Sequence, residues 1–105
     1  MQLMTPQQAK DAMDAGTAVI IDVREDDELA QAAIPGARHI PMGDLLDRLA
    51  DVPRDTTVIF SCHSGGRSEN VCRYLEENEG FSDLVNLEGG IVPWSKAGLP
   101  ITQYP

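Results

Sequence analysis

The chain has 105 residues, a length that fits one domain of ordinary size and not two. Hydrophobic residues make up 42% and charged residues 24%, which argues against a disordered chain, a collagen-like repeat or a disulfide-stapled miniprotein. The net charge of -9 would repel phosphate, so we expect neither nucleic acid nor an anionic membrane among the partners.

The N-terminal sequence MQLMTP lacks the basic segment and apolar stretch of a secretory signal. The longest apolar run is also far shorter than the ~20 residues that span a bilayer. We therefore expect a cytoplasmic protein, and a mature chain that had lost its leader would look the same.

The first elements are predicted to be a helix and a buried strand. Thr5, Pro6 and Gln8 together are typical of a helix start, because Thr5 can cap the first turn and Pro6 suits the first helical position. Gly16 then predicts the end of this helix. Residues 18–23 are nearly all apolar and β-branched, as expected of a central strand in a parallel sheet.

The next four segments are shorter. Residues 26–33 predict a second helix, and residues 34–37 have the composition of a turn. Residues 38–40, which precede a proline, predict a short edge strand. Three leucines within residues 45–49 then recur at helical spacing.

The second half of the chain repeats the strand–helix order. Residues 56–61 predict a buried strand that runs into a glycine-containing loop at 62–68, and an amphipathic helix follows and ends near residue 80. Residues 83–87 predict another strand, and 91–97 a last short helix. This alternation predicts an α/β domain with a mainly parallel sheet, whose ligands bind beyond the carboxyl ends of the strands.

The loop at 62–68, with the sequence CHSGGRS, carries the strongest chemical signal. Cys62 follows a strand and precedes a helix, so unpaired backbone N–H groups and the helix dipole favour an anion there. Gly65 and Gly66 allow the curled backbone that this requires. A helix terminus alone stabilises an anion by at most about 2 kcal/mol. We therefore expect further hydrogen bonds and the Arg67 guanidinium to support a Cys62 thiolate.

The two cysteines are expected to have different roles. Cys62 and Cys72 are ten positions apart, which fits neither a redox pair nor a zinc knuckle, and two histidines are too few for a structural metal site. The setting of Cys62 favours a nucleophile over a small buried side chain. Cys72 lies at helical spacing, which favours a core position over a resolving thiol.

Four blocks of sequence occur in order along the chain. They are Asp22-Val23-Arg24 with Glu28, Ile34-Pro35-Gly36-Ala37 with Ile40-Pro41, the loop 62–68, and Asn86-Leu87-Glu88-Gly89-Gly90 with Trp94. Together they resemble the single-domain rhodaneses, a family of sulfurtransferases. The resemblance implies one rhodanese-like domain over residues 1–105, with a five-stranded, mainly parallel sheet flanked by helices.

The resemblance also implies roles for the loop residues. Cys62 would accept sulfane sulfur as a persulfide, and Arg67 would help to bind the donor. The loop residues whose N–H groups would cradle the sulfur are His63, Ser64, Gly65, Gly66 and Ser68. His63 is either simply exposed or tunes the thiolate.

Other polar residues invite structural interpretations. Asp22, at a strand end, is a candidate general base, but we expect it to orient the loop through hydrogen bonds to backbone N–H groups or to Arg67. Arg24 and Glu28 are expected to form a structural pair, and the acidic residues 25–28 a solvated helix start. Trp94 is expected in the core or in a pocket wall.

The implied activity is that of a thiosulfate sulfurtransferase. A small anionic donor such as thiosulfate gives sulfur to Cys62, and cyanide, a thiol or an acceptor protein receives it, with no metal or organic cofactor. The alternatives are a persulfide carrier, a non-catalytic binding module and, more remotely, a phosphatase or arsenate reductase. The last two place five residues between cysteine and arginine, whereas four separate Cys62 from Arg67.

Two departures from the family pattern stand out. Ala32-Ala33 occupies the place of the usual Gly-His, and residues 63–66 contain no Lys or Arg. Members efficient with thiosulfate often carry extra positive charge in this loop. We therefore hypothesise that thiosulfate is accepted while the physiological donor is a persulfide or a donor protein.

Overall fold

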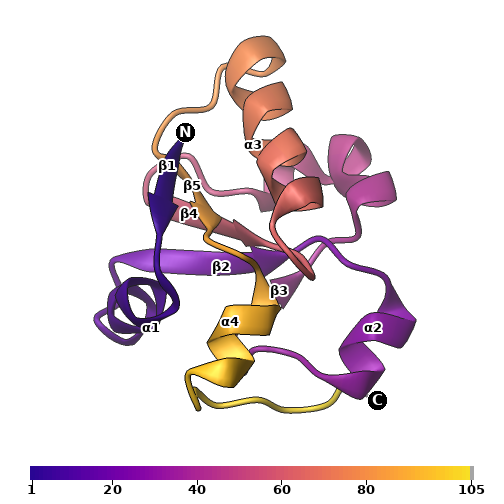
Figure 1. Ribbon diagram of the computed structural model, residues 1–105. Helices are drawn as coiled ribbons and strands as arrows, with labels where there is room; N and C mark the ends of the chain where they lie inside the picture. Colours follow the sequence, from indigo (N-terminus) through magenta and orange to yellow (C-terminus); the bar gives the residue numbers. More distant parts are fainter. Residues whose placement is uncertain (105) are drawn as a thin grey trace.

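A parallel five-stranded sheet forms the centre of the structure, a computed structural model that describes residues 1–104 (Figure 1). The strands are β1 (Gln2–Met4), β2 (Ala18–Asp22), β3 (Arg38–His39), β4 (Thr57–Ser61) and β5 (Leu84–Leu87). Their order is β1-β5-β4-β2-β3, and every neighbouring pair is parallel. The predicted fold class is therefore confirmed.

Helices cover both faces of this sheet. They are α1 (Pro6–Asp14), α2 (Asp26–Gln31), the 3-10 helical segment η1 (Met42–Asp51), α3 (Gly66–Asn78) and α4 (Ile91–Lys96). Buried side chains of α1 and α4 share a core with one face, and those of η1 and α3 share a core with the other. Trp94 is fully buried in the first core, and its Nε1 donates to the Pro100 carbonyl at 2.8 Å. The expectation of a core position is thus confirmed.

Most predicted elements are present, with differences at their ends. Thr5 and Gln8 form the reciprocal capping box expected at the start of α1. The leucine-rich segment is a 3-10 helix with a kink at Arg48 (φ -124°, ψ 29°), not a regular α-helix. β1 was not predicted, because three residues with mixed polarity carry no readable pattern.

Among residues 1–104, no helix has the length and apolar character needed to cross a membrane.

The carboxyl ends of the strands meet at one edge of the sheet. β2 ends at Asp22, and the residue after β4 is Cys62. β5, which pairs with β4, brings Asn86 beside Phe60 in register. The glycine-containing loop therefore lies where a parallel sheet of this kind binds its ligands.

Candidate active site

Cys62 lies under a ring of hydrogen-bond donors at the start of α3. Gly65 adopts a left-handed conformation (φ 105°), and its N–H donates to Cys62 Sγ at 3.1 Å. The hydroxyl of Ser68 lies 3.3 Å from the same sulfur. Cys62 is only 1% exposed, while its neighbours His63 and Ser64 line a surface pocket. Cys62 is thus largely shielded from water, and the two residues that follow it in the chain separate it from the pocket.

These donors make the sulfur more acidic than an ordinary thiol. Burial opposes ionisation, but hydrogen bonds from the Ser68 hydroxyl and from the N–H groups of Ser68, Gly65 and Ser64 outweigh it. The net effect is a pKa of Cys62 below its usual value. A thiolate is the nucleophilic form of cysteine, so the geometry favours the reactive species.

Asn86 supports the donors from beneath the loop. Its Nδ2 donates to the Gly65 carbonyl at 3.1 Å, and its Oδ1 accepts from the Ser68 hydroxyl at 2.5 Å. Because the Asn86 amide bonds to both Gly65 and Ser68, it fixes the positions of the two residues that donate to Cys62 Sγ. Sequence reasoning did not give Asn86 a role, although it is the one polar side chain in the buried strand β5.

The start of α4 supports the other side of the loop. The N–H of Ile91 donates to the Cys62 carbonyl at 2.9 Å, and that of Val92 to the His63 carbonyl at 3.3 Å. A Cβ atom on Gly90 would lie 2.5 Å from both carbonyl oxygens. Gly90 (φ 68°) therefore serves a close backbone approach as well as the turn expected there.

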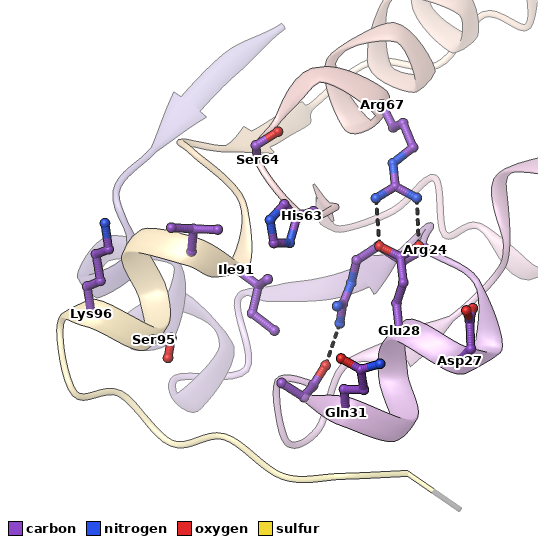
Figure 2. Close-up of a pocket in the computed structure, with 12 residues that line it drawn as sticks. Arg24, Asp27, Glu28, Gln31, His63, Ser64, Arg67, Ile91, Ser95 and Lys96 are labelled. Carbon is purple, nitrogen blue, oxygen red and sulfur yellow. Dashed lines mark hydrogen bonds and ion pairs between the residues drawn. The ribbon is translucent and has the colours of Figure 1, made fainter.

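A cavity of about 680 Å³ opens beside this loop, between α2, α3 and α4 (Figure 2). The residues from the loop and α3 that line it are His63, Ser64 and Arg67. Opposite them stand Glu28 on α2 and Lys96 near the end of α4. Of the predicted site residues, His63, Ser64 and Arg67 line this pocket, whereas Cys62, Gly65, Gly66 and Ser68 lie behind its wall.

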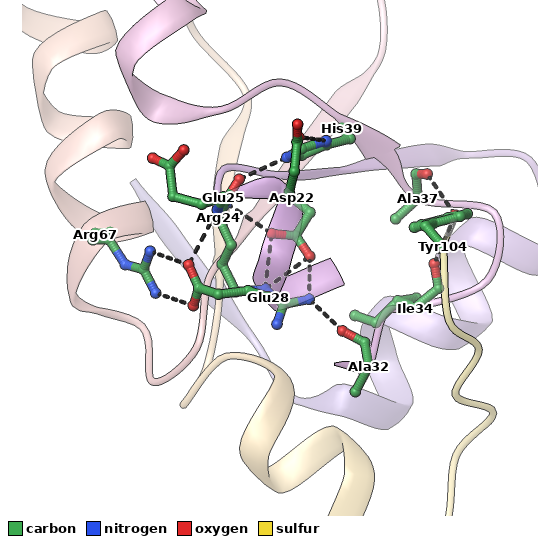
Figure 3. A network of polar contacts seen from close by, with 11 residues as sticks. Asp22, Arg24, Glu25, Glu28, Ala32, Ile34, Ala37, His39, Arg67 and Tyr104 are labelled. Atoms are coloured by element: carbon green, nitrogen blue, oxygen red, sulfur yellow. Dashed lines mark hydrogen bonds and ion pairs between the residues drawn. The ribbon is translucent and has the colours of Figure 1, made fainter. Parts of the chain in front are cut away.

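Arg67 is held by Glu28 in a two-point ion pair. Its Nη1 and Nη2 donate to the two carboxylate oxygens of Glu28, each at 2.8 Å (Figure 3). This pair lowers the pKa of Glu28 to about 2 and raises the pKa of Arg67 above its ordinary value. The expected pairing of Arg24 with Glu28 is thus wrong, and Glu28 is more than a solvated residue of a helix start.

Arg24 pairs instead with Asp22. Its N–H and Nε reach Asp22 Oδ1 at 2.9 and 3.1 Å, and Nη2 reaches Oδ2 at 2.8 Å. A further bond from Nη2 to the Ala32 carbonyl ties the end of β2 to the end of α2. The carboxylate of Asp22 thus accepts its hydrogen bonds from Arg24, two residues further along the chain. The expectation that Asp22 bonds to the loop or to Arg67 is therefore wrong. Both partners are nearly fully buried.

A comparison of this sequence with protein-family models identifies the fold's relatives. The rhodanese-like domain model matches residues 5–97, which is most of the chain. The chain belongs to the rhodanese-like family.

Individual relatives agree with this membership. The rhodanese-like chain is 49% identical over 75 residues to a putative sulfurtransferase, YtwF, from Bacillus subtilis, with 71% of each chain covered. It is 34% identical over 91 residues to the thiosulfate sulfurtransferase GlpE of Ectopseudomonas mendocina, covering 87% of this chain and 82% of that one. A crystal structure of a rhodanese-related protein from Thermoplasma volcanium superposes with a TM-score of 0.88 at 25% identity, covering 99% of this chain and 100% of that one.

The second cysteine of the rhodanese-like chain is buried and poorly ionisable. Cys72 lies on α3 within the core and is fully buried, as its helical spacing predicts. Burial raises the pKa of Cys72 to about 12. Cys62 is therefore the cysteine whose surroundings support nucleophilic chemistry.

Proposed function

We propose that this chain is a sulfurtransferase that carries sulfane sulfur as a persulfide on Cys62. The observation that supports it most is the ring of donors around Cys62 Sγ, with Gly65 N–H at 3.1 Å and the Ser68 hydroxyl at 3.3 Å. The names of the relatives favour the same class of reaction. Thiosulfate or another sulfane compound is the donor, and cyanide or a thiol is the acceptor.

The first half-reaction charges the cysteine. The Cys62 thiolate attacks the outer sulfur of thiosulfate and forms a new S–S bond, while the bond from that sulfur to the central sulfur breaks. Its electron pair leaves with sulfite, and no proton moves. The negative charge on the terminal sulfur of the persulfide falls where the loop N–H groups point, so the ring that holds the thiolate also suits the intermediate.

The second half-reaction returns the cysteine to its resting form. Cyanide attacks the terminal sulfur, the persulfide S–S bond breaks, and its electron pair restores the Cys62 thiolate as thiocyanate leaves. A thiolate acceptor follows the same course and leaves as a persulfide. Because Cys62 is 1% exposed, its own sulfur, which the acceptor does not attack, is shielded from water.

A persulfide carrier is the alternative that shares these residues, since it differs only in the final acceptor. A phosphatase is disfavoured by the four residues between Cys62 and Arg67, which make a tighter loop than an oxyanion needs. It would also require a general acid for the leaving oxygen. Glu28 lines the pocket, but its pKa of about 2 keeps it ionised at neutral pH.

Intact-mass spectrometry after incubation with thiosulfate tests the proposal. We expect the wild type and a Cys72→Ala variant each to gain one sulfur atom, and a Cys62→Ala variant to gain none. Addition of cyanide should remove the added sulfur and release an equivalent amount of thiocyanate. Sulfur on Cys72, or no adduct with thiosulfate or with any other sulfane donor, would contradict the mechanism.

A further inference from the structure

Both guanidinium groups that line the pocket are already paired with carboxylates. Arg24 is bound to Asp22, and Arg67 is bound to Glu28 (Figures 2 and 3). Lys96, the other cationic residue of the pocket wall, stands on the exposed end of α4. The pocket therefore has cations, but the cation next to the cysteine loop is Arg67. The charge of Arg67 is largely compensated by Glu28 before an anion enters the pocket.

The geometry of the Arg67 pair makes this compensation specific. Both terminal nitrogens of Arg67 donate to Glu28, one to each carboxylate oxygen, at 2.8 Å. A donor that binds Arg67 must therefore share the guanidinium with Glu28 or displace it. In either arrangement the donor lies close to a fixed negative charge, and the repulsion grows in proportion to the charge of the donor.

We propose that Glu28 is a specificity-determining residue, which favours sulfane donors with one negative charge over the doubly charged thiosulfate by holding Arg67. The inference rests on the proposed function, because it concerns the donor that charges Cys62. Thiosulfate remains a substrate, but an inefficient one. The class favoured is an organic sulfane compound whose reacting end carries a single charge.

The methanethiosulfonate anion is a suitable probe of this class. Like thiosulfate it presents an outer sulfur on an oxidised sulfur atom, but it carries one charge in place of two. The Cys62 thiolate takes the outer sulfur, the S–S bond of the donor breaks, and its electron pair leaves with methanesulfinate. The two donors therefore test charge while the bond that is broken stays the same.

The experiment compares kcat/KM for the two donors in the wild type and in Glu28→Gln, with thiocyanate release as the assay. Glutamine fills similar space but carries no charge. We expect the ratio of thiosulfate to methanethiosulfonate to rise by about five- to tenfold in Glu28→Gln, as removal of one nearby charge predicts. The intrinsic reactivities of the two donors cancel in this comparison between variants.

Asp27→Asn is the matched control. Asp27 lines the same pocket from the same helix but takes no part in the Arg67 pair. We expect its ratio to change by less than about twofold, since an exposed charge is screened by solvent. An unchanged or lower ratio in Glu28→Gln, or an equal rise in Asp27→Asn, would overturn the inference.

A second variant, Glu28→Ala, covers the case in which Glu28→Gln fails to fold. It removes the same negative charge beside Arg67, so the ratio of thiosulfate to methanethiosulfonate should again rise by about five- to tenfold. An unchanged or lower ratio in the folded variant would overturn the inference. If neither donor places sulfur on Cys62 in the wild type, the proposed function itself fails.

Discussion

The hydroxyl of Ser68 has one proton and three acceptors within reach. They are Cys62 Sγ at 3.3 Å, the Gly65 carbonyl at 3.2 Å and Asn86 Oδ1 at 2.5 Å. A hydroxyl donates to one acceptor at a time, so ionisation of Cys62 draws the proton toward sulfur and away from its other partners. The acidity of Cys62 therefore depends on Ser68, a residue that forms no covalent bond with the cysteine sulfur.

Replacement of Ser68 tests this dependence. In Ser68→Ala the thiolate loses a donor, so we expect the pKa of Cys62 to rise and its alkylation by iodoacetamide at pH 7 to slow by about tenfold, as loss of one hydrogen bond to a charged group predicts. The rate is measured in a Cys72→Ala background, which leaves a single thiol. An alkylation rate equal to that of the parent would show that the Ser68 hydroxyl does not stabilise the thiolate.

Individual residues differ in how far the sequence predicts them. Cys62 and the loop glycines could be predicted because strand, loop and helix are neighbours in the chain. The partner of Arg67 could not, since Glu28 lies 39 residues away and the pairing depends on how α2 meets α3. Whether Glu28 pairs with Arg24 or with Arg67 is decided by tertiary packing, which the spacing of residues within one helix does not reveal.

At the scale of elements, the cysteine loop is held between β5 and the start of α4. Gly90 permits two backbone hydrogen bonds from α4 to the loop, and any side chain there would collide with the carbonyl oxygens of Cys62 and His63. The loop geometry is thus set by a segment almost thirty residues further along the chain. The sequence indicated a tight turn at Gly89 and Gly90 but could not show what the turn rests against.

Gly90→Ala tests this support. We expect the variant to lose at least about 1–3 kcal/mol of unfolding free energy through strain at a positive φ, and more through displacement of the loop. Sulfur transfer from thiosulfate should fall by more than the fraction of protein unfolded. Gly98→Ala, at a positive φ with open space around it, is the control for strain alone. Equal activity per folded molecule in both variants would contradict the role of Gly90.

The pair between Glu28 and Arg67 joins α2 to α3 and makes part of the stability depend on pH. Its folded pKa of about 2 lies below the ordinary value of 4.5, so the stabilisation is complete above pH 4.5 and is lost as the pH falls toward 2. We expect the difference in unfolding free energy between the wild type and Glu28→Gln, measured with urea, to shrink over this range. A difference that stays constant with pH would contradict the pairing.

Element prediction was most accurate where the signal is local. The capping box of α1 needs only Thr5 and Gln8, and the buried strands β2 and β4 are continuous apolar runs. β1 has no such signal and exists because its backbone pairs with β5. The kinked segment η1 is amphipathic, and periodicity alone does not separate a 3-10 helix with a kink at Arg48 from an α-helix.

On the scale of the whole molecule, a chain with a net charge of -9 encloses one small site that prefers an anion. The long-range field repels anions, while the loop N–H and hydroxyl donors act over about 3 Å. A compensated Arg67 leaves these short-range hydrogen bonds as the main support of the thiolate. The sequence predicted the repulsion from its net charge and the loop donors from the order of strand, loop and helix, but the pairing of Arg67 with Glu28 required the structure.

Titration of Cys62 in the Cys72→Ala background is the most direct test of this arrangement. The thiolate absorbs in the ultraviolet, so its formation can be followed against pH beside N-acetylcysteine in the same buffer. We predict a midpoint for Cys62 below that of the free thiol, because the loop donors outweigh burial. A midpoint at or above that of the free thiol would contradict the claim that this loop stabilises the anion.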